Sequence, residues 1–257
     1  LDANDSRKVQ TIVNPSGQSA VNFKICSRRG ESNDSDEPWM QHVTGQLSSA
    51  EKDDCDFEPL SVDKARNDCS NLLVTHDELY KKLRADGFEL GPMFQALQTV
   101  WLGADQSLGY VKLPAEEEGE LGKYLLHPLL LDACLTAGAL GAFQILEIPF
   151  EVESEIILPG GIEKIEVVSA APSELWAHGT NFVYADTQDY VFKGDIHLFD
   201  SSGRVVAKLT GFYYRRAARS SIERTMGGVK KGFLHDFEWR PISNRPEGLS
   251  PAQEDWL

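Results

Sequence analysis

The feature that most constrains the fold is a long apolar stretch in the middle of the chain, residues 124–146. Pro128 suits the first turn of a helix, and the residues that follow are apolar on nearly every helical face. A helix of this kind is buried on all sides, as when a sheet wraps around it. The stretch therefore predicts a buried central helix, and it contains one carboxylate, Asp132.

Candidate strands lie on both sides of this helix in the sequence, because apolar and polar residues alternate there between turn signals. They cover residues 9–13, 20–27, 39–47, 94–102 and 108–113 before the helix, and 156–158, 162–168, 175–183, 190–199 and 205–214 after it. Residues 200–203 read as a hairpin turn. A helix followed by consecutive antiparallel strands indicates the α+β class, with a long sheet curled around the helix.

A shorter helix is predicted directly after Thr75, which fits the capping-box pattern together with Glu78. Gly87 is expected to end this helix. Residues 48–58 are acidic and show no periodicity, so we expect a linker there. The three consecutive glutamates at 116–118 are expected in a solvated loop.

Net charge limits the classes of partner to be expected, and cysteine content limits the metal sites and the cellular location. The 257-residue chain has 25 Lys plus Arg against 40 Asp plus Glu, a formal net charge of −15. An electrostatic field of that sign repels phosphates, so neither nucleic acid nor an anionic membrane is an expected partner. No apolar run in the sequence reaches the roughly 20 residues that a membrane-spanning helix needs. The four cysteines show neither zinc-site spacing nor the density of a disulfide scaffold. We therefore expect no metal and a cytoplasmic location.

Asp132 is the candidate for chemistry. A carboxylate inside an apolar helix is costly unless it is neutralised or paired, and desolvation raises its pKa. A carboxylic acid that stays partly protonated near neutral pH can donate a proton to a leaving hydroxyl group, which is general acid catalysis. The structural alternative is that Asp132, about one turn after Pro128, only accepts hydrogen bonds from the first amides of the helix.

Several motifs follow one another in an order found in one enzyme family. They are W-x-x-H-x-x-G at residues 39–45, G-P-x-F at 91–94, H-P-x-x-x-D at 127–132, the hairpin at 200–203 and F-E-W-R-P at 237–241. This ordered set resembles the dehydratase domain of type I modular polyketide synthases over nearly the whole chain. The resemblance implies a double hotdog, in which two sheets each wrap around a long helix, with the first hotdog incomplete here.

The resemblance also implies an activity, the removal of water from a β-hydroxyacyl chain on an acyl carrier protein. Asp132 occupies the position of the family's catalytic acid. No cofactor is implied, because the substrate is carried on the phosphopantetheine arm of the carrier protein. The residues expected along the substrate tunnel are Leu90, Pro92, Phe94, His127, Pro128 and Thr136.

Three departures from the family pattern bear on this activity. The family's base is a histidine in H-x-x-x-G-x-x-x-x-P, and none of the six histidines here has that context; after His42, the nearest, Gly45 follows three residues later instead of four. Leu90 replaces the family's tyrosine before Gly-Pro, and Thr136 replaces the usual glutamine or histidine. A positioned base contributes about 10²- to 10⁴-fold to such a reaction. The base is therefore expected upstream of Leu1, or it is missing.

Three interpretations stay open. The chain is a dehydratase whose histidine lies outside this sequence, a catalytically degenerate dehydratase fold that serves as a scaffold or carrier-docking module, or a related isomerase or oxa-Michael cyclase. A stand-alone hotdog thioesterase would also wrap a sheet around a helix, but it fits the segments at Trp39 and at 238–239 poorly.

The partners implied by the resemblance are an acyl carrier protein, neighbouring synthase domains and a second copy in a homodimer. An acidic carrier requires basic groups on this acidic chain. Arg215, Arg216 and Arg219 form the best cluster for carrier docking, and Arg28 and Arg29 form the second. The expected domains are a partial N-terminal hotdog at 1–58, a linker and helix at 59–90, the C-terminal hotdog with the Asp motif at 91–217, and a linker into a following domain at 218–257.

Overall fold

The computed structural model describes residues 7–17, 19–29, 38–49, 57–85, 90–147, 151–152, 155–185 and 190–218. Within these residues the strands form two antiparallel sheets, one of three strands and one of eight, and the longest helix packs against the larger sheet. The α+β class expected from the sequence is thus confirmed. Most of the predicted linker at 48–58, and the chain from residue 219 onward with its F-E-W-R-P motif, lie outside the described residues.

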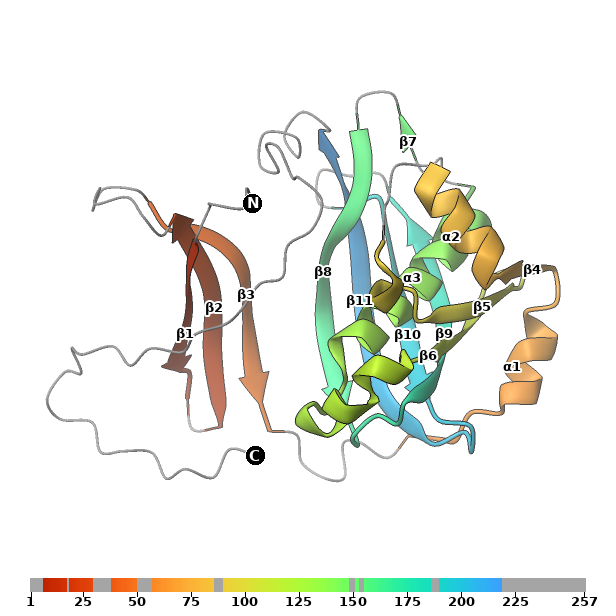
Figure 1. The fold of residues 1–257 in the computed structure, drawn as a ribbon, viewed down its shortest axis with the longest axis horizontal. Coiled ribbons are helices and arrows are strands. Elements are labelled where there is room, and N and C mark those ends of the chain that lie inside the picture. Colours follow the sequence, from red (N-terminus) through yellow and green to blue (C-terminus); the bar gives the residue numbers. More distant parts are fainter. Residues whose placement is uncertain are drawn as a thin grey trace, which may run out of the picture.

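The smaller sheet contains the three strands predicted near the N-terminus, β1 (Arg7–Pro15), β2 (Ala20–Arg29) and β3 (Met40–Ser48), in that order (Figure 1). The strand register and the alternation of side chains place Val13, Val43 and Leu47 on one face of this sheet. All three side chains are exposed. This sheet therefore presents an apolar face to its surroundings.

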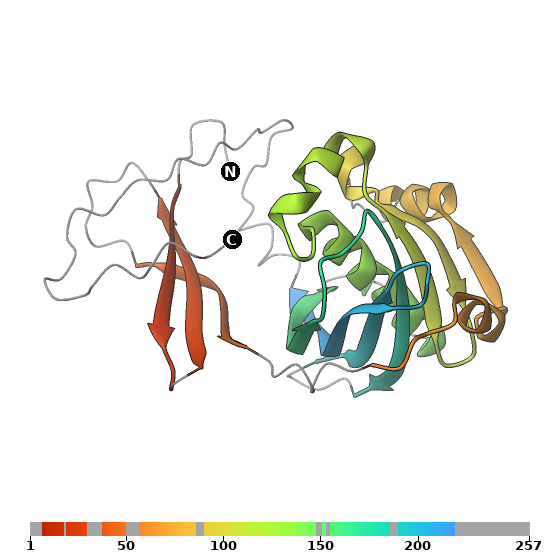
Figure 2. The same ribbon diagram turned by 90° about the horizontal axis from the view of Figure 1, so that it is seen from below.

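The larger sheet has the strand order β4-β5-β6-β9-β10-β11-β8-β7. Its strands are β4 (Leu72–Thr75), β5 (Leu97–Leu102), β6 (Ser107–Lys112), β7 (Glu151–Val152), β8 (Glu155–Val167), β9 (Glu174–Tyr184), β10 (Phe192–Phe199) and β11 (Val205–Ala218). Figure 1 and Figure 2 show this sheet curving around helix α3 (Pro128–Ile145), which packs against β5, β6, β9 and β10. This is the helix predicted from the apolar stretch.

Glycine residues let α3 approach the sheet closely. A Cβ atom added at Gly141 would lie 2.5 Å from the Cβ of Ser107 on β6, and one added at Gly138 would lie 2.5 Å from the Cδ1 of Ile196 on β10. The helix is long and apolar enough to cross a membrane by length and composition, but more than half of it is buried inside the protein. Its apolar composition is therefore explained by packing against the sheet.

Two shorter helices accompany the larger sheet. Helix α2 (His76–Ala85) confirms the helix predicted after Thr75, whose backbone N–H donates to Glu78 Oε2 at 3.0 Å. Helix α1 (Val62–Asp68) was not expected, because its seven residues carry too short an apolar pattern to predict it. The guanidinium group of Arg66 lies over the rings of Trp101 and Trp176, which belong to β5 and β9.

Three local predictions need correction. Residues 156–158 and 162–168 belong to one strand, β8, because Pro159 lies at a bulge in the pairing with β11 and does not end the strand. Phe94 belongs to the 3₁₀ turn η2 (Pro92–Phe94), and β5 begins only at Leu97. The glutamates at 116–118 lie in the 3₁₀ helix η3 (Ala115–Lys123), not in a loop.

The edge strand β4 falls within the segment 59–90, which was expected to contain only a linker and a helix. Four residues are too few for a strand pattern to be recognised against the neighbouring helix. Part of this segment is therefore integral to the eight-stranded sheet. The domain boundaries themselves stay a prediction.

Candidate active site

Asp132 lies in the second turn of α3, and the residues before it fix where the helix begins. His127 is the N-cap, and its Nδ1 accepts the backbone N–H of Leu129 at 3.3 Å. Pro128 occupies the first helical position, where its missing N–H costs nothing. The His127 ring is buried and lies edge-on to the ring of Tyr124. His127 therefore acts as a cap that sets the start of the helix carrying Asp132.

The expectation that α3 is buried on every side is wrong. Pro128 and Asp132 are exposed, whereas Leu130 and Cys134 are fully buried against the sheet. The residues along the side that the sheet leaves uncovered are Pro128, Leu131, Asp132, Leu135 and Thr136, and we call this side the open face of α3. The sequence did not reveal this face because it contains leucines as well as polar residues.

The Asp132 carboxyl group is only partly hydrated. Although the residue is exposed, the protein beneath it removes part of its hydration, and this desolvation raises its pKa. Among the described residues no hydrogen-bond donor or cation contacts the carboxyl group. The structural alternative, a carboxylate bound by the first helix amides, is therefore not found. A carboxyl group with a raised pKa and no partner among the described residues suits proton donation.

Two buried tyrosines that the sequence did not single out lie within electrostatic range of Asp132. Burial raises the pKa of Tyr80 to about 12, with a smaller upward contribution from the Asp132 charge. Burial also raises the pKa of Tyr214, and Asp132 again adds to the shift. Both residues belong to apolar patterns, one on α2 and one on β11, so the sequence indicated only core positions for them. The thiol of Cys134 is fully buried, and burial strongly raises its pKa.

We expect Asp132→Asn to stabilise the folded protein at neutral pH. The folded-state pKa of Asp132 lies above its unfolded value, so ionisation costs more in the folded state, and wild type loses stability as pH rises through the folded pKa. Well below the ordinary aspartate pKa of about 3.9 the carboxyl is protonated in both states and the cost disappears. The melting temperature of the variant should exceed that of wild type at neutral pH and converge with it in acid. A wild type that melts higher than the variant at neutral pH would contradict the desolvation of this carboxyl group.

The predicted tunnel residues fall into two groups. Leu90 packs partly buried against the main core, whereas Pro92 and Phe94 are exposed on η2, which packs against α3. Phe94 is 48% exposed and its neighbour Met93 is 46% exposed, so neither is a core residue. The Thr136 hydroxyl donates to the backbone oxygen of Asp132 at 2.9 Å. It is therefore engaged by its own helix and not by the Asp132 carboxyl group.

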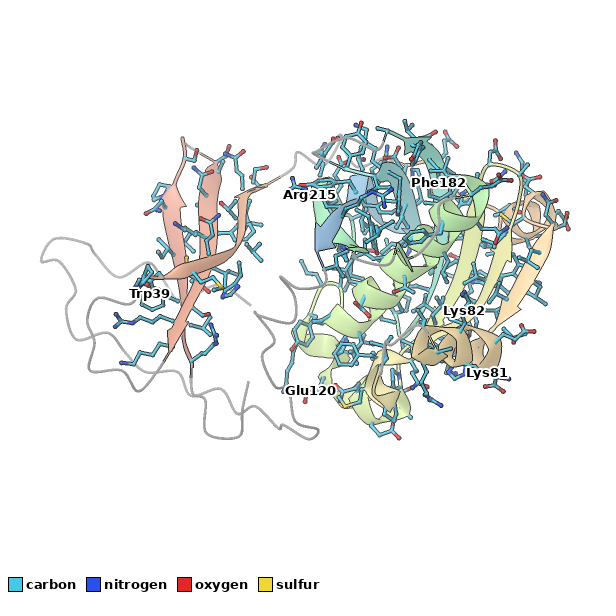
Figure 3. All side chains as sticks on the ribbon, turned by 90° about the horizontal axis from the view of Figure 1, so that it is seen from above. Trp39, Lys81, Lys82, Glu120, Phe182 and Arg215 are labelled. Atoms are coloured by element: carbon cyan, nitrogen blue, oxygen red, sulfur yellow. The ribbon has the colours of Figure 1, made fainter. Side chains whose placement is uncertain are left out.

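The structure describes two of the three arginines of the best docking cluster, and these two lie on opposite faces of their strand. Arg215 is exposed on β11 (Figure 3). Its guanidinium group lies 5.2 Å from the centre of the Tyr213 ring. Successive residues of a strand point to opposite faces, so the partly buried Arg216 points to the other side of the sheet. Arg219 lies outside the described residues, as does the side chain of Arg29; Arg28 lies over the ring of Trp39.

No set of three or more His, Cys, Asp or Glu side chains suited to a metal ion occurs in the part of the chain that the structure describes. His42, the histidine nearest in context to the family's base, lies on β3 in the smaller sheet. Its Nε2 lies 2.7 Å from the Oγ of the buried Ser27. The structure therefore gives His42 a partner within its own sheet.

Comparison with known proteins identifies the family. Residues 57–223 match the family described as "Polyketide synthase dehydratase N-terminal domain". The chain is 24% identical to polyketide synthase PksN of Bacillus subtilis over 96% of its own length, and 32% identical to erythronolide synthase EryA2 of Saccharopolyspora erythraea over 52% of its length. It spans only 4% of the length of each of these synthases.

Solved structures resemble this fold as well. The dehydratase domain from the CurJ module of curacin polyketide synthase matches with a TM-score of 0.68 and 27% identity, covering 84% of this chain and 70% of that one. The CurK dehydratase domain matches with a TM-score of 0.65 and 25% identity, covering 86% of this chain and 71% of that one. The double-hotdog expectation is thereby confirmed.

Proposed function

Because the chain belongs to the polyketide synthase dehydratase family, we propose that it eliminates water from a β-hydroxyacyl thioester carried by an acyl carrier protein. The observation that carries the proposal is Asp132, the one carboxylate on α3, held on the open face of that helix with a raised pKa. A related domain supports the role. CurK dehydratase has been crystallised as an inactive mutant with histidine replaced by phenylalanine, and as an inactive mutant with aspartate replaced by asparagine.

The proposed elimination proceeds as follows. A base removes a proton from the α-carbon of the acyl chain, and the electron pair of that C–H bond forms the double bond to the β-carbon. The C–O bond at the β-carbon breaks, and the protonated Asp132 transfers its proton to the departing hydroxyl group. The products are water and an α,β-unsaturated thioester, and the carboxylate is reprotonated before the next turnover.

The base is the part of this mechanism that the sequence does not supply. No histidine here lies in an H-x-x-x-G-x-x-x-x-P motif, and His42 bonds to Ser27 in the smaller sheet. We assign removal of the α-proton to a group outside these 257 residues. The absence of the histidine motif from this sequence also favours the second candidate, a degenerate dehydratase fold that serves as a scaffold. Such a fold would dock a carrier protein without turnover. An isomerase or oxa-Michael cyclase would use the same acid.

The proposal also specifies the partners and the cellular location of the reaction. The partner is an acidic acyl carrier protein whose phosphopantetheine arm brings the substrate to Asp132, so no separate cofactor is needed. Arg215 is the exposed, described residue of the proposed docking cluster. Neighbouring synthase domains, a homodimeric state and a cytoplasmic location complete the proposal.

Incubation of the chain with a β-hydroxyacyl thioester, once on a carrier protein and once on free pantetheine, tests the function. We expect both substrates to lose one water, detected by mass spectrometry, when a dehydratase segment carrying the histidine motif is present. Added salt should slow only the carrier-bound substrate, because it screens charge-dependent docking. Carrier binding without any loss of water would favour the scaffold over the enzyme.

A further inference from the structure

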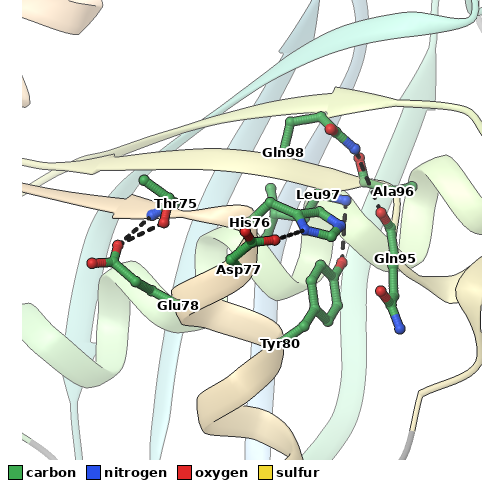
Figure 4. Close-up of polar contacts among 9 residues, drawn as sticks. All are labelled: Thr75, His76, Asp77, Glu78, Tyr80, Gln95, Ala96, Leu97 and Gln98. Atoms are coloured by element: carbon green, nitrogen blue, oxygen red, sulfur yellow. Dashed lines mark hydrogen bonds and ion pairs between the residues drawn. The ribbon is translucent and has the colours of Figure 1, made fainter.

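Tyr80 connects α2 to the chain segment that leads from η2 into β5. Its side chain is buried, at 7% exposure. The hydroxyl group accepts the backbone N–H of Leu97 at 3.2 Å and donates to the backbone oxygen of Phe94 at 3.4 Å. Figure 4 shows the Tyr80 hydroxyl directed at Leu97. One hydroxyl group thus holds both ends of the turn between η2 and β5.

Further side-chain contacts hold this segment. The Nε2 of Gln95 donates to the backbone oxygen of Leu90 at 2.9 Å, and the Nε2 of Gln98 donates to the backbone oxygen of Ala96 at 3.2 Å. The Tyr80 ring is itself held by the ring of His76, with 4.8 Å between the ring centres. The backbone from residue 90 to 97 is therefore fixed by side chains and not by sheet pairing alone.

This fixed backbone presents apolar side chains outward. Met93 and Phe94 are about half exposed, so packing in the core does not set their positions. The backbone of Phe94 is held at two points: its N–H donates to the Gly91 oxygen at 2.9 Å, and its own oxygen accepts the Tyr80 hydroxyl at 3.4 Å. The turn also packs against α3, and the charge of Asp132 contributes to the raised pKa of Tyr80. An apolar surface is thus held beside the proposed acid.

We propose that Tyr80 is a positioning residue that holds residues 90–94 as an apolar wall of the acyl-binding site next to Asp132. This inference rests on the proposed function. Tyr80 does not contact the reacting atoms, and its effect is exerted through Phe94. Since the wall consists of Leu90, Met93 and Phe94, it favours acyl chains that are apolar beyond the β-carbon.

Tyr80→Phe tests the proposal because it removes the hydroxyl group and keeps the ring that packs on His76. We expect the dissociation constant of an α,β-unsaturated octenoyl-pantetheine, measured by calorimetry, to rise about three- to ten-fold, because loss of the hydroxyl group removes both hydrogen bonds that hold the turn. For the shorter crotonyl analogue the rise should be smaller. In turnover assays that include the segment with the histidine motif, KM should rise while kcat is retained, because Asp132 is unchanged. Amide exchange at Leu97 should accelerate.

Tyr110→Phe is the matched control. It removes a hydroxyl group that donates to Glu174 Oε2 at 2.8 Å in an exposed pair on β6 and β9. This control should leave thioester binding and exchange at Leu97 unchanged. An unchanged dissociation constant in Tyr80→Phe, equal effects of both variants, or a fall in kcat at constant KM would overturn the positioning role. Absence of turnover in wild type even with the added segment that carries the histidine motif, together with weaker binding in Tyr80→Phe, would reject the proposed function and retain the positioning role.

Discussion

Asp132→Asn should lower the rate of dehydration by about 10²- to 10⁴-fold, the contribution typical of a positioned general acid. The substitution keeps the size and planarity of the side chain and removes the proton that the leaving hydroxyl group requires. Thioester binding should change little, because the amide still fits the open face of α3. The measurement is kcat for a β-hydroxyacyl thioester in the presence of the segment that carries the histidine motif, followed through the absorbance of the unsaturated product.

Glu147→Gln is the control for this prediction. Glu147 is exposed just beyond the C-terminus of α3, so the same chemical change is made near the same helix without touching the site. The control should keep the wild-type rate. If Asp132→Asn retained a third or more of the activity, the acid would have to be another group. A rate lost through unfolding is distinguishable, because Asp132→Asn is expected to melt above wild type at neutral pH.

Gly141→Ala should lower the free energy of unfolding by about 1–3 kcal/mol, the usual cost of overpacking a core. Helix propensity alone predicts the opposite, a gain of roughly 1 kcal/mol when glycine in a helix interior becomes alanine. The clash decides the sign, because the new methyl group would lie 2.5 Å from the Cβ of Ser107 and 3.1 Å from the Cζ of Phe182. A Cβ atom is attached directly to the backbone and cannot rotate away.

Urea unfolding measured by tryptophan fluorescence checks this prediction, since Trp101 and Trp176 lie 5.7 Å apart in the larger sheet. Gly119→Ala is the control, because nothing lies within 4 Å of a Cβ added at Gly119. Ser107→Gly combined with Gly141→Ala should recover part of the loss by removing the atoms that clash. Equal stability of Gly141→Ala and Gly119→Ala would show that α3 does not pack this closely.

Local signals in the sequence were sufficient for much of the fold. The apolar stretch with Pro128 predicted α3, and Thr75 with Glu78 predicted the start of α2. The hairpin turn before β11 is present, with the backbone N–H of Gly203 donating to the oxygen of Asp200. Elements of this kind are specified by residues close together in the chain, so their pattern is legible without knowledge of the partners. Shorter elements such as β4 and α1 carry too few residues to form such a pattern.

The sequence by itself determined that one carboxylate would lie in an apolar helix, because composition and periodicity are properties of a single segment. The tertiary structure alone decided which side of that helix the sheet covers, and so left Asp132 exposed but partly desolvated by the protein beneath it. It also brought Tyr80 to the backbone of Phe94 and Leu97, and placed Arg215 and Arg216 on opposite faces of β11. These relations depend on contacts between distant segments and on strand register, which no local pattern encodes.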